Sequence, residues 1–321
     1  MIKTLLFIII SILLLSSVAN AQYKKNLIIA GPFTTVSHPI FHMMENNSLK
    51  EVSNKIEFRY WKNQDELRAM ILRGNIDFMA IPINVAANLY NKGVDLQLLN
   101  VSIWGNYGIV SSNPNIKSIK DLKGKSIAIP SRGDMPDIIF KKLLKANEIN
   151  YKEDIKISYM PTPIDGLSMV VKGKIESAFL PEPALSMALI KAKKFNKKLY
   201  LNINIQDSWK KDFNTLETFP QVGFAVMGKN KNNKEIINKF IQEYKKSMLW
   251  YKNNKYEASK IVVKYLPMLH QKAIEIGIKN IIIDTKQTKD VKNKIKDWFK
   301  LLKTENDKLI GGKLPNSGFY Y

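Results

Sequence analysis

The sequence predicts an α/β protein made of two similar halves. Short apolar runs alternate along its 321 residues with stretches of helical periodicity. Turns rich in Pro, Gly, Ser or Asn separate these segments. About 300 residues follow the N-terminal apolar segment, which is more than one ordinary hydrophobic core contains, so we expect two domains.

Apolar runs of four to nine residues predict the strands. The first run, 26–30, stops at Gly31, and the run 56–60 alternates apolar and polar residues. The run 76–81 is apolar apart from Asp77, as is typical of a buried strand. The remaining predicted strands cover 96–104, 107–111, 126–130, 155–159, 177–180, 199–205 and 219–227.

Helices are predicted where apolar residues recur every three or four positions. In the segment 64–73, Leu67, Met70 and Ile71 follow this spacing, and Gly74 ends the helix. The chain beyond Lys234 is expected to be mostly helical. The other predicted helices begin near 40, 85, 135, 163 and 184.

The N-terminus predicts export from the cytoplasm. Lys3 precedes the apolar run 5–15, and Ala19 and Ala21 flank Asn20 as in a small-x-small cleavage site. This pattern indicates a secretory signal peptide over residues 1–21, cleaved after Ala21. The alternative is a membrane anchor, but the apolar run is shorter than the ~20 residues that a spanning helix needs.

The amino-acid composition argues against some classes of protein and partner. The sequence has no cysteine, so it predicts neither a disulfide framework nor a lipid-modified cysteine. The formal charge is +22, but nearly all of the 50 basic residues are Lys, and they are scattered among Asn and Ile. Nucleic-acid binding proteins concentrate Arg and Lys on one face, so we expect solvated surface lysines and no nucleic-acid partner.

Six stretches occur in a specific order and spacing along the chain, namely 65–74 with Asp77, 82–93, 119–130, 131–137, 178–184 and 310–315. Together they resemble the type II periplasmic binding proteins of the nitrate/sulfonate/taurine and thiamine-precursor group. The resemblance covers nearly the whole mature chain.

The resemblance implies two lobes, each a mixed sheet flanked by helices, joined by two crossing strands near 104–110 and 212–223. Lobe 1 would contain 22–107 and 220–321, and lobe 2 would contain 108–219. It also implies a monomeric periplasmic protein that binds a small, anionic or heteroaromatic, ligand between the lobes and delivers it to an ABC permease in the inner membrane. We expect no enzyme activity and no cofactor.

Two other functions remain open from the sequence. One is a periplasmic sensor or accessory binding protein. The other is an enzyme, because related folds include enzymes of thiamine-pyrimidine and menaquinone biosynthesis. The export signal and the lack of a recognisable catalytic set argue against the enzyme.

Four loops at strand ends could supply hydrogen-bonding groups to a ligand. The loop after the first strand carries Thr35, Ser37 and His38. Its hydroxyl groups, together with backbone amides at the following helix start, could bind an anion. The alternative is that Ser37 only caps that helix.

The second and third loops carry Asn84 and the segment Ser131 to Asp134. Asn84 is either an N-cap or an amide that faces the ligand. Arg132 could pair bidentately with a carboxylate, sulfonate or phosphate. Alternatively, Arg132 pairs with Asp134 or Asp137 and only shapes the loop.

The fourth loop carries Glu182 between two prolines. Its carboxylate could accept a hydrogen bond from an amine or ring nitrogen, or it could cap its own helix. Trp104, like Trp61 and Tyr107, is a candidate stacking wall, although aromatic residues are more often part of the core. We expect the ligand between the Ser37 and Asn84 loops of one lobe and the 131–134 and Glu182 loops of the other.

His38 and His42 are four residues apart, and Glu45 follows. On one helix, these residues could face a metal ion. No further close ligand accompanies them and Pro39 interrupts the pattern, so we predict no metal site.

Overall fold

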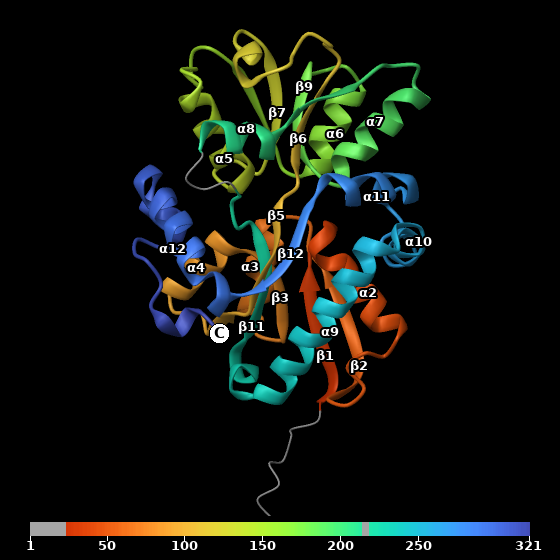
Figure 1. Cartoon of the computed structure of the whole chain (residues 1–321), viewed down its shortest axis with the longest axis vertical. Coiled ribbons are helices and arrows are strands. Elements are labelled where there is room, and N and C mark those ends of the chain that lie inside the picture. Colours follow the sequence, from red (N-terminus) through yellow and green to blue (C-terminus); the bar gives the residue numbers. More distant parts are fainter. Residues whose placement is uncertain (1–23, 214–217) are drawn as a thin grey trace, which may run out of the picture.

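The computed structural model describes residues 24–213 and 218–321, which form two mixed β-sheets flanked by helices. Figure 1 shows one sheet above the other, with β5 (Asn100–Gly105) leading into β6 (Tyr107–Ser111) between them. The predicted signal peptide lies outside the described residues. Within the described ranges, no helix is long and apolar enough to cross a bilayer.

The lower sheet and its helices, which we call lobe 1, come from both ends of the chain (Figure 1). Its other strands are β1 (Lys24–Gly31), β2 (Ser53–Tyr60), β3 (Phe78–Pro82), β4 (Leu96–Leu98), β11 (Val222–Met227) and β12 (Ile282–Gln287). The strand order is β12-β5-β11-β3-β1-β2, and β4 also pairs with β11. Its helices are α2 (His38–Glu45), α3 (Gln64–Leu72), α4 (Ile83–Asn91), α9 (Lys234–Asn253), α10 (Lys255–Tyr265), α11 (Gln271–Gly277) and α12 (Thr288–Glu305).

The upper sheet and its helices, which we call lobe 2, come from the middle of the chain. Besides β6, its strands are β7 (Ser126–Pro130), β8 (Lys156–Met160), β9 (Ser177–Pro181) and β10 (Tyr200–Asn204). The strand order is β10-β6-β9-β7-β8. The helices are α5 (Met135–Ala146), α6 (Pro163–Val171), α7 (Ala184–Lys194) and α8 (Ile205–Asp212).

The central strands are apolar runs because both of their faces are covered. All five residues of β3 and of β9 are buried, as expected for strands between two layers of helices. β3, β7 and β9 each end in a proline, namely Pro82, Pro130 and Pro181. Proline has no amide hydrogen, so it can end a strand where the chain must leave the sheet.

Two chain segments cross between the lobes, as the predicted fold class requires. The first is the β5–β6 connection through Asn106, and the second leads from α8 to β11. The lobe 1 strands that continue them approach each other closely: a Cβ added at Gly223 of β11 would lie 1.8 Å from the backbone oxygen of Asn100 of β5. Only glycine fits there without a shift of the backbone. The boundaries 107/108 and 219/220 remain a prediction.

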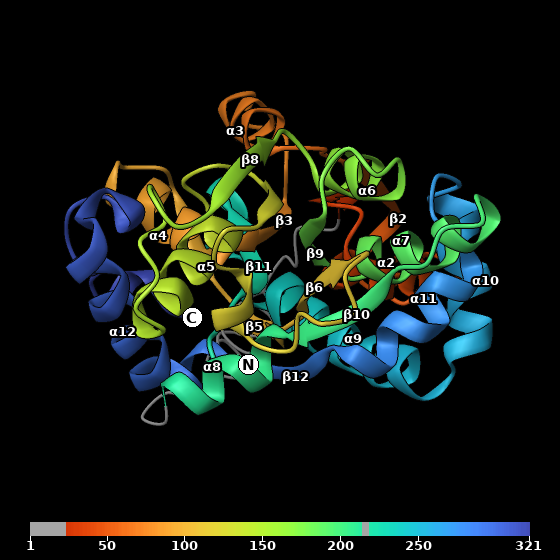
Figure 2. The same ribbon diagram turned by 90° about the horizontal axis from the view of Figure 1, so that it is seen from above.

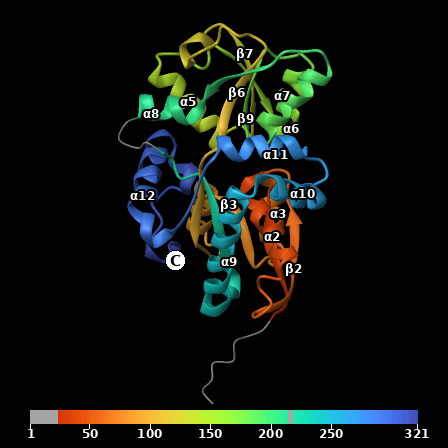
Figure 3. The same ribbon diagram turned by 45° about the vertical axis from the view of Figure 1, so that its right-hand side comes forward.

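The lobes also touch at the two ends of the molecule, where Figures 2 and 3 show α12 on one side and α10 and α11 on the other. On the α12 side, Trp209 of α8 meets Trp298 with ring centroids 5.6 Å apart, and Phe219 contacts both rings. Lys142 of α5 donates to Glu305 of α12 at 2.7 Å. These contacts tie α12 of lobe 1 to lobe 2.

Two elements do not follow the sequence pattern. β12 interrupts the C-terminal region that was expected to be helical and pairs antiparallel with β5. α8 directly follows β10 and was not predicted. Its N-cap Asn204 accepts hydrogen bonds from the backbone amides of Gln206 and Asp207, which satisfies two otherwise unpaired groups of the first turn.

Candidate ligand-binding cleft between the lobes

The carboxyl ends of strands from both sheets face a cleft between the lobes. Pro82, Pro130 and Pro181, the last residues of β3, β7 and β9, all line its deep part. The two crossing segments contribute Tyr107 and Gln221. Ligands of α/β sheets collect at such strand ends, so this cleft is the candidate binding site.

The deep part has a volume of about 100 Å³ and aromatic walls. Phe33, Trp61 and Tyr107 line it, and the ring of Tyr107 packs on Phe179 with centroids 5.1 Å apart. Burial raises the pKa of Tyr107, and the nearby Asp134 carboxylate raises it further. The Tyr107 hydroxyl therefore stays protonated and can act as a hydrogen-bond donor.

Gln221 is fixed at the cleft by its backbone and by its side chain. Its backbone nitrogen donates to the backbone oxygen of Ile103 at 3.0 Å, and its backbone carbonyl accepts from the backbone nitrogen of Ile83 at 3.1 Å. Its Nε2 donates to Asn106 Oδ1 at 2.6 Å. Among the described residues, no group hydrogen-bonds to its buried Oε1, which leaves one fixed acceptor at the cleft.

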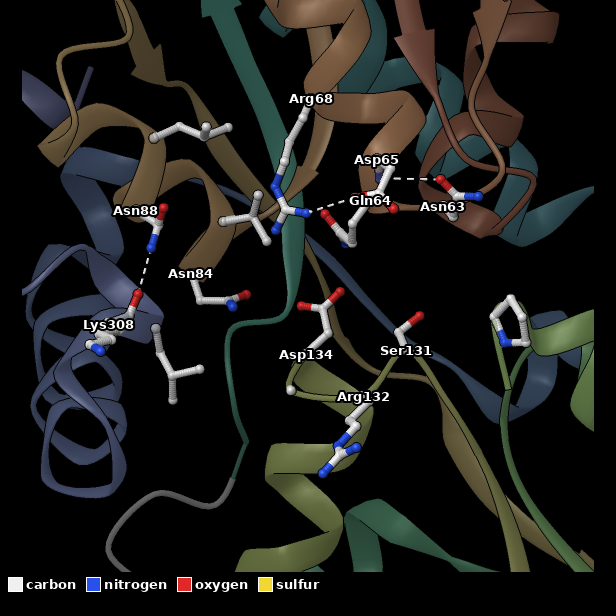
Figure 4. Close-up of a pocket in the computed structure, with 15 residues that line it drawn as sticks. Asn63, Gln64, Asp65, Arg68, Asn84, Asn88, Ser131, Arg132, Asp134 and Lys308 are labelled. Carbon is white, nitrogen blue, oxygen red and sulfur yellow. Dashed lines mark hydrogen bonds and ion pairs between the residues drawn. The ribbon is translucent and has the colours of Figure 1, made fainter. Parts of the chain in front are cut away.

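The outer part of the cleft has a volume of about 330 Å³. Figure 4 shows Gln64 and Arg68 of α3 and Asn84 of α4 on one side, with Asp134 on the other. Gln64 and Asp134 line both parts. The two parts therefore form one continuous cleft, and Asp134 lies at their junction.

Asp134 of lobe 2 is the carboxylate that faces lobe 1. Burial raises its pKa, whereas hydrogen bonds from the Met135 amide and from the side chains of Gln64 and Asn84 lower it, as does the positive charge of Arg68. Partners from α3 and α4 thus surround a carboxylate at the start of α5. A negative charge is favoured at a helix N-terminus.

Ser131 and Arg132 line the outer part of the cleft, but the Arg132 guanidinium is directed away from Asp134 (Figure 4). It lies over the ring of Tyr159, 5.1 Å from the centroid. Asp137 instead accepts from Lys141 at 2.9 Å and from Tyr159 at 3.0 Å. Arg132 therefore stacks on an aromatic ring and forms no ion pair with Asp134 or Asp137 within the described residues, and its pairing with a ligand remains a prediction.

The loop with Thr35, Ser37 and His38 turns into lobe 1 and is almost fully buried. These three residues are not among the described residues that line the cleft. His38 Nδ1 lies 2.8 Å from the Tyr251 hydroxyl, and its Nε2 lies 2.9 Å from the Phe33 carbonyl oxygen. Ser37 precedes α2 but makes no side-chain capping bond. The three side chains therefore belong to the core of lobe 1, and their contact with a ligand remains a prediction.

Trp104 and Glu182 are also buried away from the lining. Trp104 Nε1 donates to the Asp284 carbonyl at 2.6 Å, which fixes the ring against β12. Glu182 accepts from the Ser186 amide at 3.1 Å and from Asn280 Nδ2 at 2.7 Å. Burial raises its pKa, and these hydrogen bonds lower it. Glu182 therefore holds the first turn of α7 and joins lobe 2 to lobe 1.

The cleft contains residues that the sequence analysis did not identify. Asn63, Gln64 and Arg68 belong to the start of α3, Phe33 follows β1, and Gln221 directly precedes β11. The rule that strand ends face the ligand also applies to β2, which ends three residues before Asn63. Applied there, it points to this segment. Asn84 lies inside the first turn of α4, whose N-cap is the preceding proline.

His38, His42 and Glu45 each contact a different group. His42 Nδ1 lies 3.0 Å from Ser247 Oγ, and Glu45 accepts from Lys264 at 2.7 Å. Burial lowers the pKa of His42. Within residues 24–213 and 218–321, no three His, Asp or Glu side chains are arranged to hold a metal ion.

Comparisons with known proteins agree on this architecture. Residues 106–258 match the family described as NMT1/THI5 like, whereas none of the curated proteins matches the sequence. The structure of an ABC transporter protein from Parabacteroides distasonis is 21% identical, with a TM-score of 0.75 over 92% of this chain and 99% of that chain.

Two further structures have the same fold. The periplasmic aliphatic sulphonate binding protein SsuA of Escherichia coli is 16% identical, with a TM-score of 0.68 over 89% of this chain and 96% of that chain. The periplasmic nitrate-binding protein NrtA of Synechocystis PCC 6803 is 15% identical, with a TM-score of 0.62 over 82% and 73%. Residues 106–258 are thus similar to the NMT1/THI5-like family, and the chain has the two-lobed fold of these periplasmic binding proteins, as the sequence resemblance indicates.

Proposed function

We propose that this chain is the periplasmic solute-binding component of an ABC importer. The observation that carries this proposal is the cleft, where strand ends of both sheets and both crossing segments meet. A small molecule bound there contacts both lobes, so that it favours the state in which they are closed. The fold relatives described as periplasmic binding proteins support this assignment.

Contacts between the lobes support a closed state that a permease could recognise. Lys142 pairs with Glu305 on one side, and Asn280 donates to Glu182 on the other. Between them, Asp134 of lobe 2 faces amide groups of lobe 1. The closed lobes place groups from both halves next to each other, and this composite surface is what the permease would bind.

The remaining parts of the proposal come from the sequence. The signal peptide over residues 1–21 would direct the chain to the periplasm, where it acts as a monomer and meets its permease in the inner membrane. Lobe 1 would contain 22–107 and 220–321, and lobe 2 would contain 108–219. The chain would bind its ligand without catalysis.

The proposal is tested by identifying the small molecule that the purified protein retains. The mature chain is purified under native conditions, heat-denatured, and the released small molecules are identified by mass spectrometry. We expect one retained compound, and we expect that compound to raise the melting temperature of the emptied protein by several degrees, since ligand binding stabilises the folded state by mass action. Absence of a retained compound, together with no response to any small-molecule fraction of periplasmic extract, would overturn the proposal.

A pair of variants locates the site. Gln221→Leu removes the polar group at the cleft with little change in size, and should abolish retention. Gln97→Leu makes the same change on β4, where the side chain donates to the Tyr320 carbonyl outside the cleft, and should retain the compound. Equal retention by both variants would place the site elsewhere.

A further inference from the structure

Several polar atoms at the cleft are hydrogen-bond acceptors that lack a partner. Besides the Asp134 carboxylate, the side-chain oxygens of Gln64, Asn84 and Gln221 are buried, with no hydrogen-bond partner in the described part of the chain. Asn84 is 3% exposed and Gln221 is 1% exposed. Buried polar atoms need a partner, so these oxygens indicate that the natural ligand donates hydrogen bonds.

The orientation of these amides follows from their neighbours. The side chains of Gln64 and Asn84 point toward Asp134 (Figure 4), and an ionised carboxylate can only accept, which favours their nitrogens on that side. Their oxygens must therefore point elsewhere. In Gln221, the nitrogen is already engaged by Asn106. A reversed amide in any of these residues would place two acceptors against each other.

The two arginine side chains at the cleft contact other groups of the protein. Arg68 is paired with Asp65 at 3.2 Å, and its charge also acts on Asp134. Arg132 stacks on Tyr159. An anion placed between Asp134 and these oxygens would therefore meet like charge and acceptor atoms, and its desolvation there would be unfavourable, although Lys62 and Lys308 also line the cleft.

The shape of the deep part favours a flat ligand. Phe33, Trp61 and Tyr107 offer aromatic surfaces in a volume of about 100 Å³. Trp61 is 6% exposed and its Nε1 is buried without a partner among the described residues. This indole donor suits one acceptor atom on the ligand.

Given the proposed function, we propose that the cleft selects a planar ligand that is cationic or neutral and donates N–H groups, and that it rejects anions. Amidine, guanidine and amide groups meet this requirement. Asp134 accepts the strongest of the donated hydrogen bonds, and the oxygens of Asn84 and Gln221 accept others. Trp61 donates to the far side of the ligand. This class differs from the sulphonate and nitrate ligands of the fold relatives.

The test compares probes that share a ring and differ in charge. Binding of benzamidine, benzoate and benzenesulfonate to the emptied protein is measured by titration calorimetry and by the shift in melting temperature. We expect benzamidine to bind and raise the melting temperature, and both anions to leave it unchanged. Binding of an anion, or failure of benzamidine to bind, would overturn the inference.

A variant pair assigns the acceptor. Asp134→Asn removes the charge and should weaken benzamidine binding about 10- to 100-fold, as expected for a hydrogen bond to an ionised group. Asp95→Asn makes the same change where the carboxylate is paired with Lys231 outside the cleft, and should bind like the native protein. Equal affinities would overturn the role of Asp134. Retention of an anionic compound on purification would refute this inference while leaving solute binding intact.

Discussion

The buried imidazole of His38 should make the protein less stable in mild acid. Burial lowers its pKa from the ordinary 6.5 to about 4, although the hydrogen bond to the Phe33 carbonyl raises it in part. Because a carbonyl oxygen only accepts, Nε2 carries the proton and Nδ1 accepts from the Tyr251 hydroxyl. The folded protein therefore holds this side chain neutral.

The magnitude follows from the difference between the two pKa values. In the unfolded chain, the imidazole is protonated below about pH 6.5, whereas in the folded protein it stays neutral until about pH 4. The unfolded state thus binds more protons in this window, and the free energy of unfolding falls as the pH falls. At 1.36 kcal/mol per pKa unit, the loss between pH 7 and pH 4 is roughly 3 kcal/mol.

The assay is urea unfolding at several pH values between 4 and 7 for the native protein and for His38→Gln. Glutamine keeps a donor for the Phe33 carbonyl and cannot be protonated in this range. Other groups, such as Glu182 with its raised pKa, titrate in both proteins and cancel in the difference. We expect the native protein to lose roughly 3 kcal/mol more than the variant.

A second variant tests the cause of the shift. Tyr251→Phe removes the hydroxyl group but leaves His38 buried, so this variant should keep most of the acid sensitivity. Parallel pH profiles of the native protein and His38→Gln would refute the reasoning, because they would mean that His38 takes up its proton equally in the folded and unfolded chains.

Two further substitutions test how the lobes are joined. Gly223→Ala should lower the free energy of unfolding by about 1–3 kcal/mol or more, because its Cβ would lie 1.8 Å from the Asn100 oxygen; a melting temperature equal to the native value would contradict this. Lys142→Ala breaks the pair with Glu305 and should cost about 1 kcal/mol and open the lobes. An unchanged radius of gyration in solution scattering would show that this pair does not hold them together.

The sequence predicts the parts of the fold that depend on local pattern. The strands β3, β7 and β9 are apolar runs that end at prolines, and the same rule led to Asn84, Ser131 and Asp134 in the cleft. Strand β12 could not be predicted in this way because only two of its six residues are apolar. Its pairing with β5, some 180 residues earlier, provides the stabilisation that its own sequence does not indicate.

The direction in which loop side chains point could not be predicted from the local sequence pattern. Thr35 and His38 follow a strand end, as the rule requires, but a 3₁₀ turn over Thr35–Ser37 directs them into the core. Conversely, Gln64 reaches the cleft only because lobe 2 brings Asp134 next to it. Which face of a loop meets the ligand depends on how the two lobes close, and single-sequence periodicity carries no information about that.

The hydrogen bond between Gln221 and Asn106 has a consequence for discrimination between ligands. It joins the two crossing segments at the point where both line the cleft, so the residues proposed to contact the ligand lie on the same segments that would set the angle between the lobes on closure. A molecule that fits poorly there would change that angle as well as bind more weakly. The permease could then reject a wrong cargo by the geometry of the complex, even when that cargo is abundant enough to occupy the cleft.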